Sequence, residues 1–206
     1  MSVSDDLIPV LKKLRLSGVL NTLDLRTSEA VDQNLSHAEF LFRVCSDEVQ
    51  RRDSKQLDLR MRRASFESTQ RIDDFDWSFN PGIPKAKIID LAACHFIERR
   101  EAAILIGPAG VGKSHIAQAI GERACRCGHS VCYVSAHKML AQLRASRADQ
   151  TYDRKMLRFT SPDLLIIDDL GLRPLSGDEP IDLYEVIRQR YERGAMIVTS
   201  NRALEE

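Results

Sequence analysis

The chain has 206 residues, of which 43% are hydrophobic and 29% are charged, and its formal net charge is zero. This composition suits one ordinary domain with a smaller one beside it, and it excludes an argument for nucleic-acid binding from overall charge alone. No apolar run approaches the ~18 residues of a membrane span, and the first residues lack the basic start and apolar run of a secretory signal.

Five cysteines are scattered along the chain, and none of them stands at a spacing that is typical of metal ligands. Three lie in apolar or helical settings, where cysteine commonly acts as a small core residue. These features predict a cytoplasmic protein in a reducing compartment, without a structural metal site.

Residues 4 to about 70 predict a small helical region that ends before a linker. Apolar residues recur at spacings of three and four as far as Leu23, with a break expected near Gly18. A second helix is expected to begin at Ser36, because Ser36-His-Ala-Glu39 has the pattern of a capping box. We expect residues 1–72 to form a helical N-terminal domain and residues 73–84 to form the linker, which is rich in Asp, Asn, Pro and Gly.

Two helical stretches are rich in basic residues. Each stretch is compatible with a face that contacts DNA phosphates and with an ordinary solvated helix face, and both interpretations stay open. The candidates for DNA contact are Arg51, Arg52, Arg60, Arg62 and Arg63 in the first stretch, and Lys138, Arg144, Arg147, Arg154, Lys155 and Arg158 in the second.

The remainder of the chain, residues 85–206, predicts an α/β domain. Short apolar runs that read as buried strands alternate with helical patterns, which indicates a parallel sheet flanked by helices. The expected strands are residues 102–106, 130–134, 163–169 and 195–201, and the expected helices are residues 85–100, 114–127, 137–160 and 179–193.

The turn between the first of these strands and the next helix matches the phosphate-loop pattern G-x-x-x-x-G-K-[ST] at every fixed position. Its glycines allow the backbone to bend around a phosphate, and the helix start adds partial positive charge. We expect Lys113 to reach the β- and γ-phosphates of ATP and the Ser114 hydroxyl to hold Mg²⁺. The residues expected to bind the nucleotide are Gly107, Pro108, Ala109, Gly110, Val111, Gly112, Lys113, Ser114 and His115.

Polar residues that suit hydrolysis follow two later strands. Asp168 and Asp169 end the third strand, where Asp168 would hold the Mg²⁺ shell and Asp169 would polarise the attacking water. Asn201 ends the fourth strand and would either orient that water or act as a turn residue. In the linker, Phe75, Trp77 and Phe79 would either cover the adenine or pin the linker to the core.

With the phosphate loop, the stretch 164–171 (Leu-Leu-Ile-Ile-Asp-Asp-Leu-Gly) and the stretch 198–202 (Val-Thr-Ser-Asn-Arg), the chain resembles an AAA+ P-loop ATPase. More narrowly it is similar to the IstB-type ATP-binding proteins of insertion sequences, relatives of the DnaC helicase loader. The resemblance implies that the phosphate loop is Walker A, that Asp168 and Asp169 form Walker B, and that Asn201 is sensor 1. It also implies ATP-dependent homo-oligomers on double-stranded DNA that help a transposase to capture its target.

Members of this family carry a further helix, a fifth strand and a helical lid after sensor 1, with an arginine finger and a second sensor arginine. This sequence stops at Glu206, so we expect the C-terminal lid and both arginines to be missing and one edge of the first core strand to be unpaired. An arginine finger supplies ~10³–10⁵ in rate in nucleotide hydrolases. The expectation is therefore a chain that binds ATP and hydrolyses it slowly.

Two other functions stay open beside a transposition helper. A helicase loader of the DnaC type would use the same ATPase core with a replicative helicase as its partner. A truncated core that does not hydrolyse ATP would serve only to bind DNA or a partner. A neighbouring transposase gene would favour the helper over the loader, and ATP turnover would exclude the module without catalysis.

Overall fold

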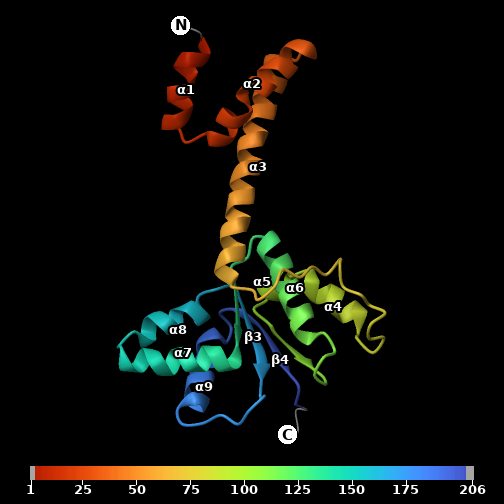
Figure 1. Ribbon diagram of the computed structural model, residues 1–206, viewed down its shortest axis with the longest axis vertical. Helices are drawn as coiled ribbons and strands as arrows, with labels where there is room; N and C mark the ends of the chain where they lie inside the picture. Colours follow the sequence, from red (N-terminus) through yellow and green to blue (C-terminus); the bar gives the residue numbers. More distant parts are fainter. Residues whose placement is uncertain (1–2, 203–206) are drawn as a thin grey trace. The chain divides into compact units, whose positions relative to one another are not determined.

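The computed structural model describes residues 3–202 (Figure 1). The expectations that rest on Met1 and Ser2, and on the chain end at residues 203–206, lie outside the described residues. The chain divides into two compact units, the first ending at Asp58 and the second beginning at Leu59. The limits of 1–72, 73–84 and 85–206 that the sequence suggests stay a prediction.

The first unit is helical. It contains α1 (Val3–Lys13), α2 (Ser17–Asp32) and the first part of α3 (His37–Ala64). Leu11, Val19 and Val44 are buried together at its centre. The predicted capping box is confirmed, since the Ser36 N–H donates to Glu39 Oε2 at 2.9 Å and the Glu39 N–H donates back to Ser36 Oγ at 3.3 Å. This reciprocal pair satisfies N–H groups that a helix start leaves free.

The second unit is built on a parallel sheet of four strands, as predicted. The strands are β1 (Ala102–Ile106), β2 (Val131–Ser135), β3 (Leu164–Leu170) and β4 (Ala195–Ser200), in the order β1-β4-β3-β2. Among the described strands β1 pairs only with β4. The helices of this unit are α4 (Lys85–Ala92), α5 (His95–Glu98), α6 (Lys113–Arg126), α7 (Ala136–Ala148), α8 (Tyr152–Thr160) and α9 (Glu179–Arg190).

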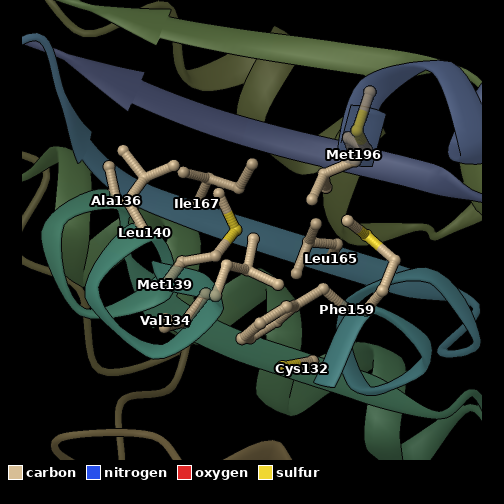
Figure 2. Packing of buried hydrophobic residues seen from close by; sticks show 12 residues of the cluster. Cys132, Val134, Ala136, Met139, Leu140, Phe159, Leu165, Ile167 and Met196 are labelled. Carbon is tan, nitrogen blue, oxygen red and sulfur yellow. The ribbon is translucent and has the colours of Figure 1, made fainter. Parts of the chain in front are cut away.

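Helices cover both faces of the sheet (Figure 1). On one face, Leu165 and Ile167 of β3 pack against α7 and α8, with Met139 and Phe159 in the same buried cluster (Figure 2). Successive side chains of a strand point to opposite faces, so Ile166 faces α6. A Cβ added at Gly121 of α6 would lie 2.7 Å from Ile166 Cδ1. The absence of a side chain at this position therefore lets α6 lie close to the sheet.

Three predicted helices end earlier than expected, each at or beside a residue with a left-handed backbone. Ser65 (φ 60°) follows the end of α3, Cys94 (φ 65°) separates α4 from α5, and Gln150 (φ 57°) lies between α7 and α8. Residues other than glycine rarely adopt this conformation. The sequence carries no glycine or proline at these points, and the predictions of unbroken helices through residues 70, 85–100 and 137–160 were therefore wrong. No described helix combines the length and apolar character that a membrane crossing requires.

Candidate functional site

The phosphate loop connects the end of β1 at Ile106 to the start of α6 at Lys113. Gly110 (φ 80°) and Gly112 (φ 94°) have left-handed backbones, which a residue with a side chain would adopt only under strain. Gly107 does not lie in that region, so the expectation that its backbone also needs glycine was wrong. Gly112 is the N-cap of α6, and its carbonyl accepts the Ile116 N–H at 2.9 Å. The loop thus delivers the chain directly into a helix start.

Lys113 turns back over this loop from the first position of α6. Its Nζ atom donates to the carbonyl oxygen of Gly107 at 2.9 Å and to that of Pro108 at 2.8 Å. The ammonium group therefore lies over the loop, beside the helix start where partial positive charge gathers. An anion in the loop would meet both sources of positive charge.

Asp168 lies opposite the loop and is 3% exposed. Its Oδ1 accepts the Ser114 hydroxyl at 3.0 Å and also the Thr199 hydroxyl, while its Oδ2 accepts the Tyr133 hydroxyl. Burial and the bond to Asp168 raise the pKa of Tyr133, which keeps this phenol a donor. Three hydroxyl groups from α6, β2 and β4 therefore hold one carboxylate in a single orientation.

Asp169 lies in an irregular part of β3. The β3–β4 register steps from Ile167 opposite Val198 to Leu170 opposite Ser200, so β3 carries one more residue than β4 there. Asp169 has a left-handed φ of 56°, and its N–H donates to Thr199 Oγ1 at 2.9 Å. Bulges of this kind redirect a side chain and are frequent at active sites.

Burial, together with the negative charge of Asp168, raises the pKa of Asp169, although the charge of Lys113 acts in the opposite direction. A carboxylate whose pKa is raised accepts a proton more readily than an ordinary aspartate. Asp168 and Asp169 are thus adjacent in the chain but differ in environment. The first is bonded on both oxygens, and the second is half-buried and has a raised pKa.

Asn201 directly follows β4, and its side chain is exposed. Because β3 and β4 are parallel, it lies at the same edge of the sheet as the two aspartates. The Ser200 hydroxyl donates to the Leu170 carbonyl at 2.8 Å and ties the two strand ends together. The structure thus brings the predicted residues of the loop, of β3 and of β4 to one edge.

Sequence reasoning missed two residues of this site, Thr199 and Tyr133. Thr199 occurs in a stretch that the resemblance used, but only its contacts show that it binds both aspartates. Tyr133 reads as an apolar strand residue, and the one available signal is that a buried tyrosine hydroxyl needs a partner. The aspartates that these two hydroxyls contact are far from Thr199 and Tyr133 in the sequence.

The linker packs on the phosphate loop through Phe75, which is buried. A Cβ added at Gly112 would lie 3.3 Å from the Phe75 ring, and this ring lies edge-on to that of His115 with centroids 5.1 Å apart. The His115 Nε2 atom is buried and has no hydrogen-bond partner among the described residues. The linker aromatics were expected either to cover the adenine or to pin the linker to the core. Phe75 pins the linker to the core, whereas Phe79 is exposed.

A cavity of about 300 Å³ lies between the end of the linker, β1 and the phosphate loop. Apolar residues including Ile83, Ile106 and Val111 line it, and Lys113 is also part of its wall. A mostly apolar cavity with a few polar groups is typical of ligand sites. Its place beside the loop suits the base of a nucleotide whose phosphates occupy the loop.

Several of the basic candidates for DNA contact are already engaged in ion pairs. Arg51 and Arg52 lie 3.4 and 2.7 Å from Glu48 Oε1. Lys138 Nζ lies 2.7 Å from Glu67 Oε1, and Arg147 bonds Asp182. Burial alone would raise the pKa of Glu48, but hydrogen bonds from Arg52, the Gly18 N–H and Arg51 lower it to about 2. The charge of these four basic residues is therefore largely compensated within the protein.

The other candidates fall into two groups. Three of them, Arg60, Arg63 and Arg158, line one cavity although they come from both basic stretches. Arg62, Arg144 and Arg154 are exposed, and Lys155 is half-buried. The structure thus separates a cluster of arginines from cations that are scattered over the surface.

Comparison with known protein families shows to which family this chain belongs. A model of the family described as IstB-like ATP binding protein matches residues 9–206. The chain belongs to this family. It is 40% identical to an insertion-sequence ATP-binding protein of Mycobacterium tuberculosis over 98% of this chain and 82% of that protein. It is 32% identical to an insertion-sequence ATP-binding protein of Geobacillus stearothermophilus over 86% of this chain and 70% of that protein.

Solved structures share the fold of this IstB-like protein. AMPPCP-bound DnaA from Aquifex aeolicus superposes with a TM-score of 0.59 at 20% identity, covering 67% of this chain and 43% of DnaA. The DnaC helicase loader superposes with a TM-score of 0.52 at 19% identity, covering 59% of this chain and 71% of the loader. These similarities establish a P-loop AAA+ fold for the parallel sheet and its helices.

Proposed function

We propose that this IstB-like protein hydrolyses ATP and uses it to help a transposase capture target DNA. The observation that carries the proposal is the contact between Ser114 Oγ and Asp168 Oδ1 at 3.0 Å, across the loop from Lys113. It joins the phosphate loop to the acidic end of β3 at the carboxyl edge of a parallel sheet. That edge is where ligands of such sheets bind.

The residues present suit ATP with Mg²⁺. Ser114 and Asp168 supply two hard oxygens within contact of one another, the ligand type that Mg²⁺ prefers. Bound there, Mg²⁺ would neutralise charge on the phosphate oxygens. Lys113 would bind the β- and γ-phosphates, and the cavity beside the loop would take the adenine. The hydroxyls of Thr199 and Tyr133 hold Asp168 in place while the nucleotide binds.

Asp169 is the group that we assign to the attacking water. Its raised pKa makes it a better proton acceptor than an ordinary aspartate, whereas both oxygens of Asp168 already accept hydrogen bonds. Asn201 would orient the same water with its amide, because it lies at the same edge and brings no charge that would compete for Mg²⁺. Hydrolysis therefore requires Asp169 in its ionised form.

The assignment to transposition rests on the family and its relatives, which are ATP-binding proteins of insertion sequences. The neighbour DnaA has been solved with AMPPCP and single-stranded DNA, which fits a fold of this kind acting on DNA. A DnaC-like loader is the second candidate, favoured by the shared fold with DnaC alone. We further propose that residues 1–72 bind the partner, that residues 73–84 are the linker and that residues 85–206 form the ATPase, acting as a cytoplasmic homo-oligomer.

The test is ATP hydrolysis by the full chain with and without double-stranded DNA. Lys113→Ala should abolish nucleotide binding and turnover, whereas Asp169→Asn should retain binding and lose turnover. Lys87→Ala removes an exposed lysine of α4 and serves as the matched control. ATP turnover that persists in Asp169→Asn would contradict the role given to that residue. If the unaltered chain binds ATP but does not hydrolyse it, the chain would instead be a module that only binds DNA or a partner.

The partner is tested separately. The chain should increase strand transfer by an insertion-sequence transposase, in an ATP-dependent manner, and should leave the loading of a replicative helicase unchanged. Stimulated helicase loading without an effect on strand transfer would contradict the role in transposition and favour a DnaC-like helicase loader.

A further inference from the structure

A second cavity lies away from the nucleotide site, at the opposite edge of the sheet. Its volume is about 430 Å³, and its walls include Arg60 and Arg63 near the end of α3 and Arg158 of α8. Ser130 and Pro162, which also line it, directly precede β2 and β3. Since the strands are parallel, these residues mark the amino-terminal edge, whereas the phosphate loop lies at the carboxyl edge. All of these residues belong to the second unit.

Arg63 and Arg158 bring positive charge to the cavity that no acidic residue of its walls compensates. None of the residues that line it is acidic. Arg158 donates to Gln142 Oε1 at 3.2 Å and lies over the Phe159 ring, and neither it nor Arg63 forms an ion pair within residues 3–202. The nearby Asp163 carboxylate already accepts the N–H and the hydroxyl of Ser130, at 2.8 and 2.7 Å.

This distinguishes Arg63 and Arg158 from the other basic candidates. Arg51, Arg52, Lys138 and Arg147 belong to the same two stretches of sequence, but each is paired with a carboxylate. A guanidinium group that pairs with a carboxylate has fewer donors left for a phosphate. Arg63 and Arg158, from helices far apart in the sequence, thus line one concave site with their guanidinium groups outside any ion pair of the described residues.

We propose that this arginine cavity (Arg60, Arg63 and Arg158) binds the phosphodiester backbone of DNA. The planar, always charged guanidinium group matches phosphate geometry, and the hydroxyl of Ser161 adds a neutral donor to the same wall. The buried Cys132 also lines the cavity. Contacts of this kind, to phosphate oxygens, fix the position of DNA and carry no sequence information directly. The inference rests on the proposed function and gives its DNA-binding step a location.

The experiment measures the affinity of the full chain for a short fluorescein-labelled DNA duplex, by fluorescence anisotropy at several salt concentrations. The test variant is Arg63→Gln with Arg158→Gln. The matched control is Arg62→Gln with Arg154→Gln, which removes the same charge from the same two helices, α3 and α8, at exposed positions outside the cavity. Binding of a fluorescent ATP analogue is measured in parallel as a check on folding and on the nucleotide site.

The cavity variant should bind DNA roughly tenfold more weakly or worse. Each phosphate contact contributes ~0.9 to the slope of log affinity against log salt, so the loss of two contacts should make this slope shallower by about 1.8. The control should keep the slope of the unaltered chain, and all three proteins should bind the ATP analogue alike. Equal losses in the two double variants would overturn the inference in favour of a diffuse basic surface. An unchanged affinity in the cavity variant would overturn it directly.

Inorganic phosphate, titrated at constant ionic strength, separates DNA from free phosphate. Thermal stabilisation by phosphate that is lost in the cavity variant, together with unchanged DNA affinity, would show that the site takes free phosphate and would overturn the assignment to DNA. If the unaltered chain binds the ATP analogue but no DNA, the DNA-binding part of the proposed function fails as well. Failure of the cavity alone is thus distinguishable from failure of the proposed function.

Discussion

The Thr199 hydroxyl donates to Asp168 Oδ1 and accepts the N–H of Asp169, so that one buried side chain of β4 holds both acidic residues of β3. Thr199 is 0% exposed. The contact coincides with the extra residue in β3 that gives Asp169 its left-handed backbone. The orientation of the carboxylate that we propose for Mg²⁺ and that of the proposed base therefore depend on the same hydroxyl.

Replacing Thr199 with valine keeps the shape of the side chain and removes this hydroxyl. Asp168 and Asp169 would each lose a buried hydrogen bond, so we expect the free energy of unfolding to fall by about 1–3 kcal/mol. ATP hydrolysis should fall further than ATP binding, because Asp169 would lose its position. Thr160→Val, which removes a hydroxyl bonded within α8 to Met156 O, is the control. Unaltered hydrolysis in Thr199→Val would show that the hydroxyl does not position the aspartates.

Gly112→Ala tests the packing of the linker on the phosphate loop. The new Cβ would lie 3.3 Å from the Phe75 ring at a residue with φ 94°, so the loop must move or the ring must give way. Gly128→Ala is the matched control, because Gly128 has φ 101° and open space around it. We expect both variants to lose ~1–2 kcal/mol of stability from backbone strain, and only Gly112→Ala to lose nucleotide binding. Equal nucleotide affinity in the two would contradict this role of the contact.

Arg190 is fully buried and binds main-chain carbonyl groups in place of a carboxylate. Burial lowers its pKa to about 10. Its side chain donates to the carbonyl oxygens of Phe159, Thr160, Pro162, Asp163 and Ala195. Arg190→Lys offers fewer donors to these buried groups, and the free energy of unfolding should fall by about 3–5 kcal/mol.

Urea denaturation measures this loss. Arg188→Lys, on the same helix and paired with the partly exposed Glu185 at 2.7 Å, should change stability by less than about 1 kcal/mol. Comparable stability of the two variants would show that the carbonyl groups find other partners.

Glu179 makes the stability of the second unit depend on pH. Hydrogen bonds from Arg173 and from the Ser176 N–H lower the pKa of Glu179 from 4.5 to about 2. The carboxylate form is thus favoured in the folded state, and its contribution is complete above pH 4.5. It is lost as the pH falls from 4.5 towards 2, so stability should decrease over this range. Glu179→Gln should flatten that part of the profile, and an identical pH dependence in the variant would contradict the assignment.

Local patterns in the sequence were enough to predict the parallel sheet, the phosphate loop and the capping box at Ser36. Each of these depends on neighbouring residues. The signals are short apolar runs that alternate with helical patterns, glycines at given spacings, and a serine three residues before a glutamate. The same patterns could not show the helix breaks at Ser65, Cys94 and Gln150, where tertiary packing holds residues in a backbone conformation that they rarely adopt.

The site divides in the same way. The sequence by itself determined the loop, Lys113, Ser114 and the two aspartates, because a phosphate loop and an acidic strand end are contiguous motifs. Only the tertiary structure decided that Thr199 and Tyr133 hold Asp168, and that Arg60, Arg63 and Arg158 surround one cavity. These groups meet because parallel strands and their helices bring distant residues to a common edge, and no local spacing records which side chains will be neighbours there.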